Sequence, residues 1–177
     1  MEKVAKGYVI EDSEVKILFT NRTVDAKNLD DVKRVCEEYN FNYTNLMYNT
    51  QVHGAAVRII KTMDDKENNG EEADGLVTSL KNTPLLIFTA DCVPLAFYDK
   101  EKEVVALAHA GWRGTYDNIA KGIVEILIKD YKCMKENIKV IIGPSVSGDN
   151  YEVSYELVEK FSVHNIDNYY KKCGEKY

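Results

Sequence analysis

Two apolar, β-type runs joined by a short charged turn limit how this chain can fold more than any other stretch. Residues 93–98 read Val-Pro-Leu-Ala-Phe-Tyr, the turn contains Asp-Lys-Glu-Lys, and residues 104–109 read Val-Val-Ala-Leu-Ala-His. Two runs of this length and spacing predict an antiparallel hairpin. Cys92 and His109 lie at the same end of this hairpin, near strand ends, where sites are usually built.

The register of the hairpin decides whether these two side chains meet. If residues 99–102 form the loop, Tyr98 pairs with Glu103, and Cys92 lies opposite His109 on one face of the ladder. A five-residue loop would turn Cys92 to the other face, unless the proline in the first strand forces a compensating bulge. We expect the two side chains to be adjacent.

The remaining elements alternate without a regular β-α-β order. Strands are expected at residues 7–10, 15–20, 46–52, 55–61, 76–79, 85–89 and 138–142, and helices at 28–39, 116–131 and 154–161. Asn28, Thr115 and Ser154 are the expected N-caps, and the strands at 76–79 and 85–89 are expected in the middle of a sheet. The pattern predicts an α+β fold of packed mixed β-sheets flanked by helices, in one domain spanning residues 1–177.

Composition excludes several classes of function. The chain has 177 residues, 45% of them hydrophobic, which is enough for one buried core. A net charge of −6 argues against a general binder of nucleic acid or anionic membrane, but not against a small anion held by one or two arginines. No apolar leader or run of about 18 apolar residues occurs, which predicts a cytoplasmic protein without a membrane segment. The sequence does not indicate an oligomeric state.

Cysteine and histidine suggest a metal site. Four cysteines without paired spacing are expected to be reduced thiols. A single histidine or cysteine is more often a packed residue than a ligand, but His53, Cys92 and His109 together match the three protein ligands of a catalytic zinc site. They are 39 and 17 residues apart, too far for a finger-type loop, so the fold itself would have to assemble the site.

Five further residues each have a functional and a structural interpretation. Asp91 is a candidate acid/base or a residue that orients a histidine; otherwise it is a strand-end aspartate satisfied by backbone amides. Arg113 and Arg22 could each clamp a phosphate or carboxylate, or form surface ion pairs. Gln51 could hydrogen-bond a base or cap a strand, and Trp112 could stack on a substrate or lie in the core.

Five motifs occur in order along the chain. They are Gln-Val-His-Gly at 51–54, Ala-Asp-Gly-Leu-Val-Thr at 73–78, Thr-Ala-Asp-Cys-Val-Pro-Leu at 89–95, Ala-His-Ala-Gly-Trp-Arg-Gly-Thr at 108–115, and Ile-Gly-Pro with Tyr-Glu-Val at 142–144 and 151–153. Together they resemble the YfiH/laccase-domain family, also labelled polyphenol oxidase or purine nucleoside phosphorylase. The resemblance covers most of residues 15–160 and implies an α+β fold of packed mixed sheets.

The resemblance also implies a function. It implies a zinc ion bound by His53, Cys92 and His109, and it implies phosphorolysis of adenosine, inosine, guanosine and methylthioadenosine, together with adenosine deamination. The expected small molecules are therefore a purine nucleoside and phosphate. The family has also been linked to the editing of peptidoglycan precursors.

The chain differs from the family pattern in two places. Family members carry a Gly-Gly-containing segment after a Phe-Thr-x-Arg motif, but here residues 19–22 lead almost directly into the helix expected at 28–39. Members also continue past the point where this sequence stops, so we interpret the domain as incomplete at its C-terminus. Either difference could leave a metal site with an incomplete substrate pocket.

Other chemistries can be compared by counting residues. Three histidines are too few for the several imidazole-rich centres of a multicopper oxidase. The His-x-Glu and Pro-Cys-x-x-Cys signature of the zinc deaminases is absent from the sequence. Two alternatives stay open: a metal-free hydrolase with Cys92 as nucleophile and His109 as base, and a binding protein without turnover.

Overall fold

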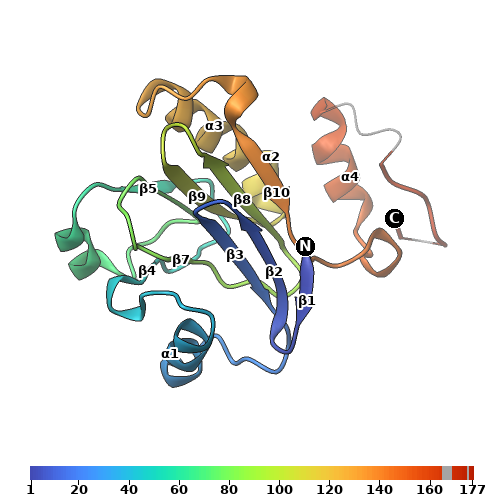
Figure 1. Ribbon diagram of the computed structural model, residues 1–177. Helices are drawn as coiled ribbons and strands as arrows, with labels where there is room; N and C mark the ends of the chain where they lie inside the picture. Colours follow the sequence, from blue (N-terminus) through green and yellow to red (C-terminus); the bar gives the residue numbers. More distant parts are fainter. Residues whose placement is uncertain (165–168, 175) are drawn as a thin grey trace.

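A five-stranded mixed sheet forms the centre of the molecule (Figure 1). The computed structural model describes residues 1–164, 169–174 and 176–177. The strand order is β10-β8-β9-β6-β5, and β5 and β6 are parallel while the other neighbours are antiparallel. The strands are β5 (Val57–Ile60), β6 (Gly75–Thr78), β8 (Val93–Asp99), β9 (Val104–Ala110) and β10 (Lys139–Ile142).

In the part of the chain that the structure describes, two smaller sheets and four α-helices accompany this sheet. One small sheet has three strands, β1 (Glu2–Val4), β2 (Gly7–Asp12) and β3 (Val15–Thr20). The other pairs β4 (Met47–Tyr48) with β7 (Leu85–Leu86). The α-helices are α1 (Leu29–Glu38), α2 (Trp112–Tyr116), α3 (Ile119–Lys129) and α4 (Tyr155–Phe161). The 3-10 turns are η1 (Tyr43–Asn45), η2 (Met63–Asn68), η3 (Lys135–Asn137), η4 (Gly148–Asn150) and η5 (Ser162–His164). The predicted α+β class with mixed sheets is confirmed.

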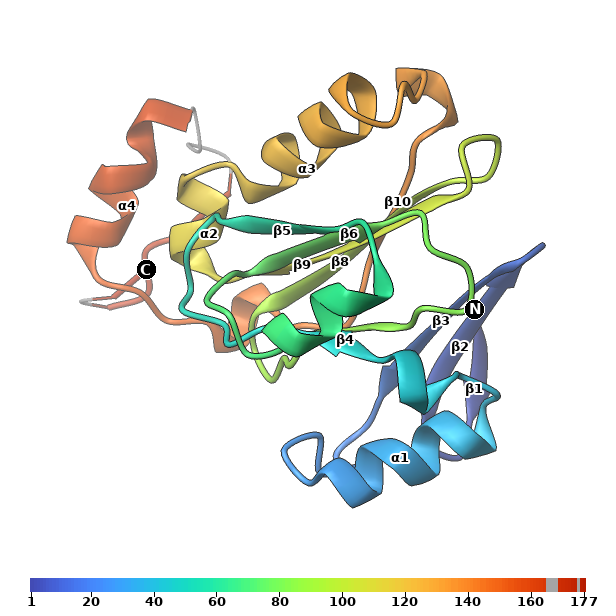
Figure 2. The same ribbon diagram turned by 90° about the vertical axis from the view of Figure 1, so that its left-hand side faces the viewer.

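One face of the large sheet is closed by α3 (Figure 2). Ile119, Ile123 and Leu127 are spaced four residues apart, so they form one apolar stripe along the helix, and all three are buried. They pack against a cluster that includes Phe97 and the alanines of β9. The small alanine side chains let the helix lie close to the sheet.

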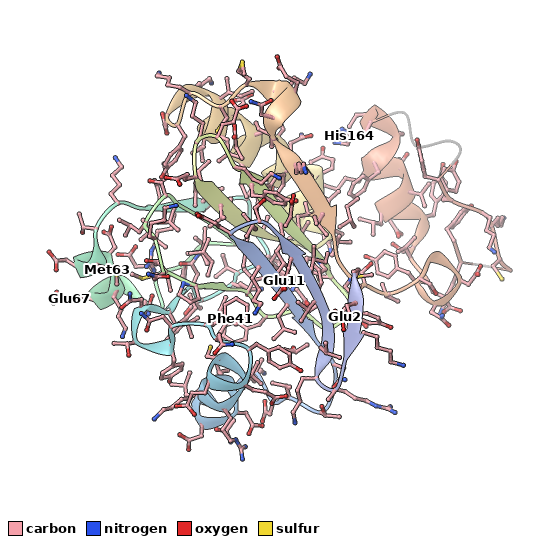
Figure 3. The ribbon with its side chains drawn as sticks, in the orientation of Figure 1. Glu2, Glu11, Phe41, Met63, Glu67 and His164 are labelled. Carbon is pink, nitrogen blue, oxygen red and sulfur yellow. The ribbon has the colours of Figure 1, made fainter. Side chains whose placement is uncertain are left out.

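The other face of the large sheet is turned toward β1–β3 and α1 (Figure 2). An open cavity of about 990 Å³, lined mainly by apolar side chains, lies between these layers. On the α1 side of this cavity, Phe41 packs in a cluster with Val32 and Cys36, and all three line the cavity (Figure 3).

The predicted helix at 116–131 is wrong at its start. The chain enters α2 at Trp112, with Gly111 as N-cap, so Thr115 lies inside a helix and does not cap one. Asn118 then adopts a left-handed backbone conformation with φ of 61°. This conformation interrupts the helical run, and α3 begins at the next residue.

The predicted central strand at 85–89 is also wrong. Only Leu85–Leu86 forms a strand, and it pairs with β4 in a separate two-stranded sheet. The side-chain amide of Gln51 hydrogen-bonds to both the backbone N–H and the backbone C=O of Phe88. These two groups are therefore not available to a neighbouring strand. By contrast, β6 lies between β9 and β5, as predicted.

In the described part of the chain, every helix is too short or too polar to cross a membrane.

A polar contact at Asp12 joins the β1–β3 sheet to the large sheet. The hydroxyl of Tyr98 and the ammonium of Lys139 donate to Asp12 Oδ2 at 2.7 and 2.9 Å, and Lys100 donates to Oδ1 at 2.9 Å. The Tyr98 hydroxyl and the two ammonium groups lower the pKa of Asp12 well below its usual range. Burial, followed by the bond to Asp12, raises the pKa of Tyr98 to about 12.

We predict that Asp12→Asn lowers the free energy of unfolding at pH 7. Because the Asp12 pKa is lowered in the folded state, its contribution is fully present above the unfolded-state value of about 3.9 and is lost as the pH falls below it. Urea unfolding at pH 7 and at pH 3 should therefore give a smaller difference between variant and wild type at the lower pH. Glu11→Gln, on the same strand, is the control, since among the described residues the exposed Glu11 side chain pairs with the single cation of Lys16. Equal stability of wild type and Asp12→Asn at pH 7 would contradict the prediction.

Candidate metal centre

Three segments far apart in the sequence bring His53, Cys92 and His109 together. One ligand atom from each lies within 4.8 Å of the other two. His53 precedes β5, Cys92 lies immediately before β8, and His109 is on β9. His109 is 3% exposed, whereas Cys92 is half-buried and His53 is exposed, so the cluster has a buried side and a side open to solvent.

The predicted adjacency of Cys92 and His109 is confirmed, but the predicted register is wrong by two residues. The ladder pairs Pro94 with His109 and Asp99 with Val104, so the loop is 100–103 and not 99–102. A shift of two residues preserves the face on which each side chain lies. Cys92 is therefore a diagonal neighbour of His109 and not its direct partner.

The side chain of Asp99 explains this register. Asp99 Oδ1 accepts hydrogen bonds from the backbone N–H groups of Glu101 and Lys102 at 2.9 and 3.2 Å. An aspartate that bonds to the backbone two residues ahead begins a turn. Asp99 is thus the last paired residue of β8, and the loop starts after it.

Glycines allow close packing at the cluster. A Cβ atom at Gly111 would lie 3.0 Å from His53 Cδ2 and 3.2 Å from Cys92 Sγ. At Gly114, a Cβ would lie 2.7 Å from the backbone oxygen of Gly54. The start of α2 therefore packs directly against the ligands and the segment that carries His53, and this approach requires residues without side chains.

Asp74 is a member of the site that the sequence interpretation missed. Its side chain is 0% exposed. Its carboxylate accepts hydrogen bonds from the backbone N–H groups of Val52, His53 and Gly54 at 3.2, 3.0 and 2.7 Å. Its Oδ1 also lies 2.7 Å from Nδ1 of His109. Asp74 occurs in the second of the five motifs, directly before a buried strand, and this position is the signal in the sequence that could have identified it.

The surroundings of Cys92 favour the neutral thiol when no cation is present. Burial, followed by the negative charges of Asp91 and Asp74, raises the pKa of the Cys92 thiol. A neutral thiol is a poor nucleophile and a poor ligand. A bound cation reverses this preference, because it stabilises the thiolate.

Two of the other predicted site residues lie close to the cluster in the chain. Asp91 is exposed, and its backbone oxygen accepts a hydrogen bond from Val146 at 3.0 Å, which ties the loop after β10 to the Cys92 segment. Gln51 donates to the Phe88 oxygen at 2.8 Å and accepts from the Phe88 N–H at 2.6 Å. This double contact agrees with the structural interpretation of Gln51, and its contact with substrate stays a prediction.

The remaining three predicted residues lie on α2 and after β3. Trp112 is half-buried, and the guanidinium of Arg113 lies 4.5 Å from the centre of its indole ring. Lys160 of α4 lies over the same ring at 5.2 Å. Arg22 is exposed in the turn that follows β3. The roles of all three in binding a substrate stay predictions.

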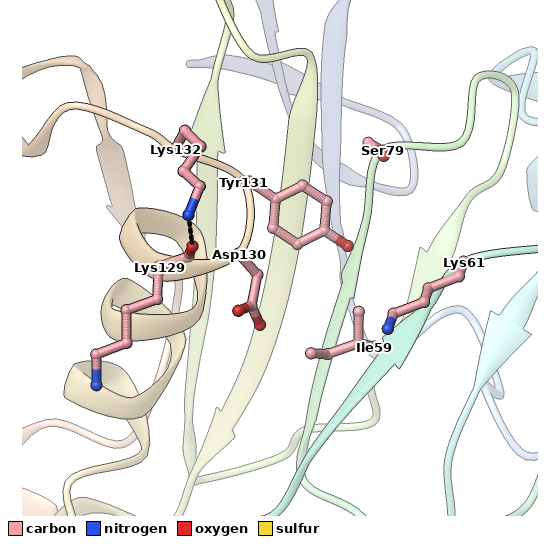
Figure 4. A pocket seen from close by; sticks show the side chains of 7 residues that line it. All are labelled: Ile59, Lys61, Ser79, Lys129, Asp130, Tyr131 and Lys132. Carbon is pink, nitrogen blue, oxygen red and sulfur yellow. Dashed lines mark hydrogen bonds between the residues drawn. The ribbon is translucent and has the colours of Figure 1, made fainter.

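A second hollow lies at the opposite end of the large sheet (Figure 4). It is lined by Ile59, Lys61, Ser79 and residues 129–132, where β5, β6 and α3 end. The two lysines of the last group lie at the C-terminus of α3, and cations at this position complement the negative end of the helix dipole. We therefore interpret these charges as structural.

The chain is similar to a known protein family and to several curated proteins. A family model described as multi-copper polyphenol oxidoreductase laccase matches residues 22–176. Among curated relatives, an adenosine deaminase from an unknown prokaryotic organism is 38% identical over 117 residues, covering 63% of this chain and 44% of the relative. A purine nucleoside phosphorylase of Clostridium acetobutylicum is 36% identical over 134 residues, covering 74% and 55%. The chain thus spans about half the length of the curated relatives it matches.

Solved structures share the fold. YlmD from Geobacillus stearothermophilus has a TM-score of 0.71 and 30% identity, covering 76% of this chain and 52% of its own. The hypothetical protein YfiH of Bacillus licheniformis has the same TM-score and coverage, with 28% identity. The match of the family model to most of the chain, together with these relatives, shows that the chain belongs to the multi-copper polyphenol oxidoreductase laccase family.

Proposed function

We propose that the chain carries the metal centre of a zinc-dependent purine nucleoside phosphorylase. The proposed substrates are phosphate and adenosine, inosine, guanosine or methylthioadenosine, with adenosine deamination as a second activity. The observation that carries the proposal is the convergence of His53, Cys92 and His109. The names of the curated relatives, a phosphorylase and a deaminase, support this choice of reactions. A cytoplasmic location stays a prediction from the sequence.

The donor set supports zinc as the proposed metal. Two imidazole nitrogens and one thiolate are ligands that zinc accepts, and three protein ligands leave a fourth position for water or substrate. When bound, such an ion polarises an oxygen of the substrate or lowers the pKa of a bound water. Multicopper chemistry needs several imidazole-rich centres, and the whole sequence contains three histidines. His164, the third of them, packs against Tyr116.

The chain's own residues have proposed roles in phosphorolysis. A phosphate oxygen would attack C1′ of the ribose, the C1′–N9 bond would break, and the purine would leave with a proton on a ring nitrogen. Arg113 would hold the phosphate, because a guanidinium can bind it through two parallel hydrogen bonds, and Arg22 would be a second anion contact. Asp91, exposed beside Cys92, would deliver the proton to the purine. Gln51 and Trp112 are proposed contacts to the nucleoside.

A metal-free Cys–His hydrolase, which would include the editing of peptidoglycan precursors, is the second candidate. One observation favours it: Asp74, His109 and Cys92 have the arrangement of an acid, a base and a nucleophile. Two observations count against it, namely the raised pKa of the Cys92 thiol and the presence of His53 among the same atoms. A third candidate is a protein that binds a nucleoside but does not turn it over.

We predict that the purified chain binds about one zinc ion, as measured by elemental analysis after removal of loosely bound metal. Cys92→Ala and His109→Ala should each weaken zinc binding by more than the roughly 10–100-fold that loss of a supporting residue costs. His164→Ala is the matched control, because it removes the histidine outside the cluster, and it should keep the wild-type affinity. A wild-type chain that stays metal-free after exposure to excess zinc would favour the hydrolase.

We predict that inosine and phosphate yield hypoxanthine, detected by chromatography. Cys92→Ala should abolish this product, whereas Cys173→Ala, which changes an exposed thiol far along the chain, should not. Arg113→Lys should raise KM for phosphate about tenfold, because lysine cannot form the paired hydrogen bonds of a guanidinium. If zinc binds but no base is released by wild type or variants, the phosphorylase proposal fails for this chain and the binding-protein alternative is favoured.

A further inference from the structure

We propose that Asp74 is the positioning residue that assembles the metal centre, because its carboxylate holds both histidine ligands in place before a metal ion arrives. This inference rests on the proposed metal site of His53, Cys92 and His109. It does not depend on the nucleoside reaction.

Asp74 binds the backbone of the segment that carries His53. Three consecutive backbone N–H groups, of residues 52–54, converge on the Asp74 carboxylate. Consecutive amides of this kind form an anion-binding concavity, and here the anion belongs to the chain itself. His53 has φ of 60°, a left-handed conformation that is uncommon for a residue other than glycine. We infer that the carboxylate keeps the segment in this conformation, since without it three amides would lose their acceptor.

Asp74 also contacts the ring of His109. Asp74 Oδ1 lies 2.7 Å from Nδ1 of the ring, and the backbone N–H of His109 donates to the backbone carbonyl oxygen of Asp74 at 2.8 Å. A carboxylate at this nitrogen keeps a proton on Nδ1 and leaves Nε2 free to bind a metal. Oδ1 also accepts from the His53 N–H at 3.0 Å, so one oxygen atom fixes the positions of two ligands.

The buried charge of the Asp74 carboxylate requires compensation. Asp74 is fully buried, and among the described residues the one basic side chain within 4.0 Å of its carboxylate is the His109 ring, with no lysine or arginine at that distance. A buried carboxylate is costly unless hydrogen bonds and positive charge compensate it. The three amides and the ring supply hydrogen bonds, and a cation bound to the ring would supply the charge.

The experiment compares metal affinity in wild type and Asp74→Asn. Asparagine has the same size, but its amide group has one acceptor oxygen and one donor nitrogen. In either orientation of the asparagine, its NH2 group therefore faces at least one backbone N–H that an Asp74 carboxylate oxygen accepts in the wild type. We expect zinc affinity to fall 10–100-fold, measured by competition with a chromophoric chelator, while the circular dichroism spectrum stays that of the folded chain.

Thr78→Val is the matched control for loss of a buried polar contact. Thr78 is the last residue of β6, the strand that begins directly after Asp74, and it is as buried as Asp74. Its hydroxyl forms hydrogen bonds with Ile60 and Leu80, at the end of β6 away from the cluster. It should lower stability and keep the zinc affinity. If Asp74→Asn binds zinc as tightly as wild type, or if Thr78→Val weakens binding equally, the proposed role of Asp74 is overturned.

A measurement on the wild-type chain decides the matter if Asp74→Asn does not fold. Nitrogen-15 NMR of the histidine rings should show His109 with a proton on Nδ1, and addition of zinc should shift its Nε2 resonance. Ligation through Nδ1 would overturn the inference while leaving the metal site intact. A wild-type chain that binds no zinc would instead remove the proposed site itself, together with this role for Asp74.

Discussion

The buried carboxylate of Asp74 is the point at which the segments of the site meet. It bonds to the backbone of residues 52–54 and to the ring of His109, and its own backbone is paired with β9. Cys92 reaches the same place because β8 is the antiparallel neighbour of β9. The cluster thus depends on a polar contact at the end of a sheet that is otherwise held together by apolar packing against α3.

Small residues and buried polar groups have complementary effects at this end of the sheet. Gly111 and Gly114 let α2 approach the ligands and the His53 segment, while the alanines of β9 let α3 lie close to the sheet. The strained backbone of His53 is placed at the exposed side of the cluster. Strain of this kind persists only when the surroundings determine it, and it is typical of functional sites. The result is a cluster of candidate ligands with one buried side and one side accessible to solvent.

Much of the architecture could be predicted from residue patterns. Apolar periodicity located α1 and most of α3, and the paired apolar runs located the β8–β9 hairpin. The site ligands could be proposed because histidine and cysteine have few roles in common besides binding a metal or catalysis. The predictions that failed depended on single polar side chains. Asp99 set the hairpin loop, Gln51 ended the strand at β7, and Asn118 divided the expected helix.

The sequence by itself determined which chemical groups are available: two imidazoles and a thiol near strand ends, with an arginine nearby. It did so because side-chain chemistry and short-range periodicity are local properties of the chain. Only the tertiary structure decided that these groups converge, and that Asp74 joins them. Convergence requires contacts between residues 21 and 35 positions apart, and hydrogen bonds over such separations leave no periodic trace in the sequence. A buried aspartate before a strand looks like a turn until its partners are known.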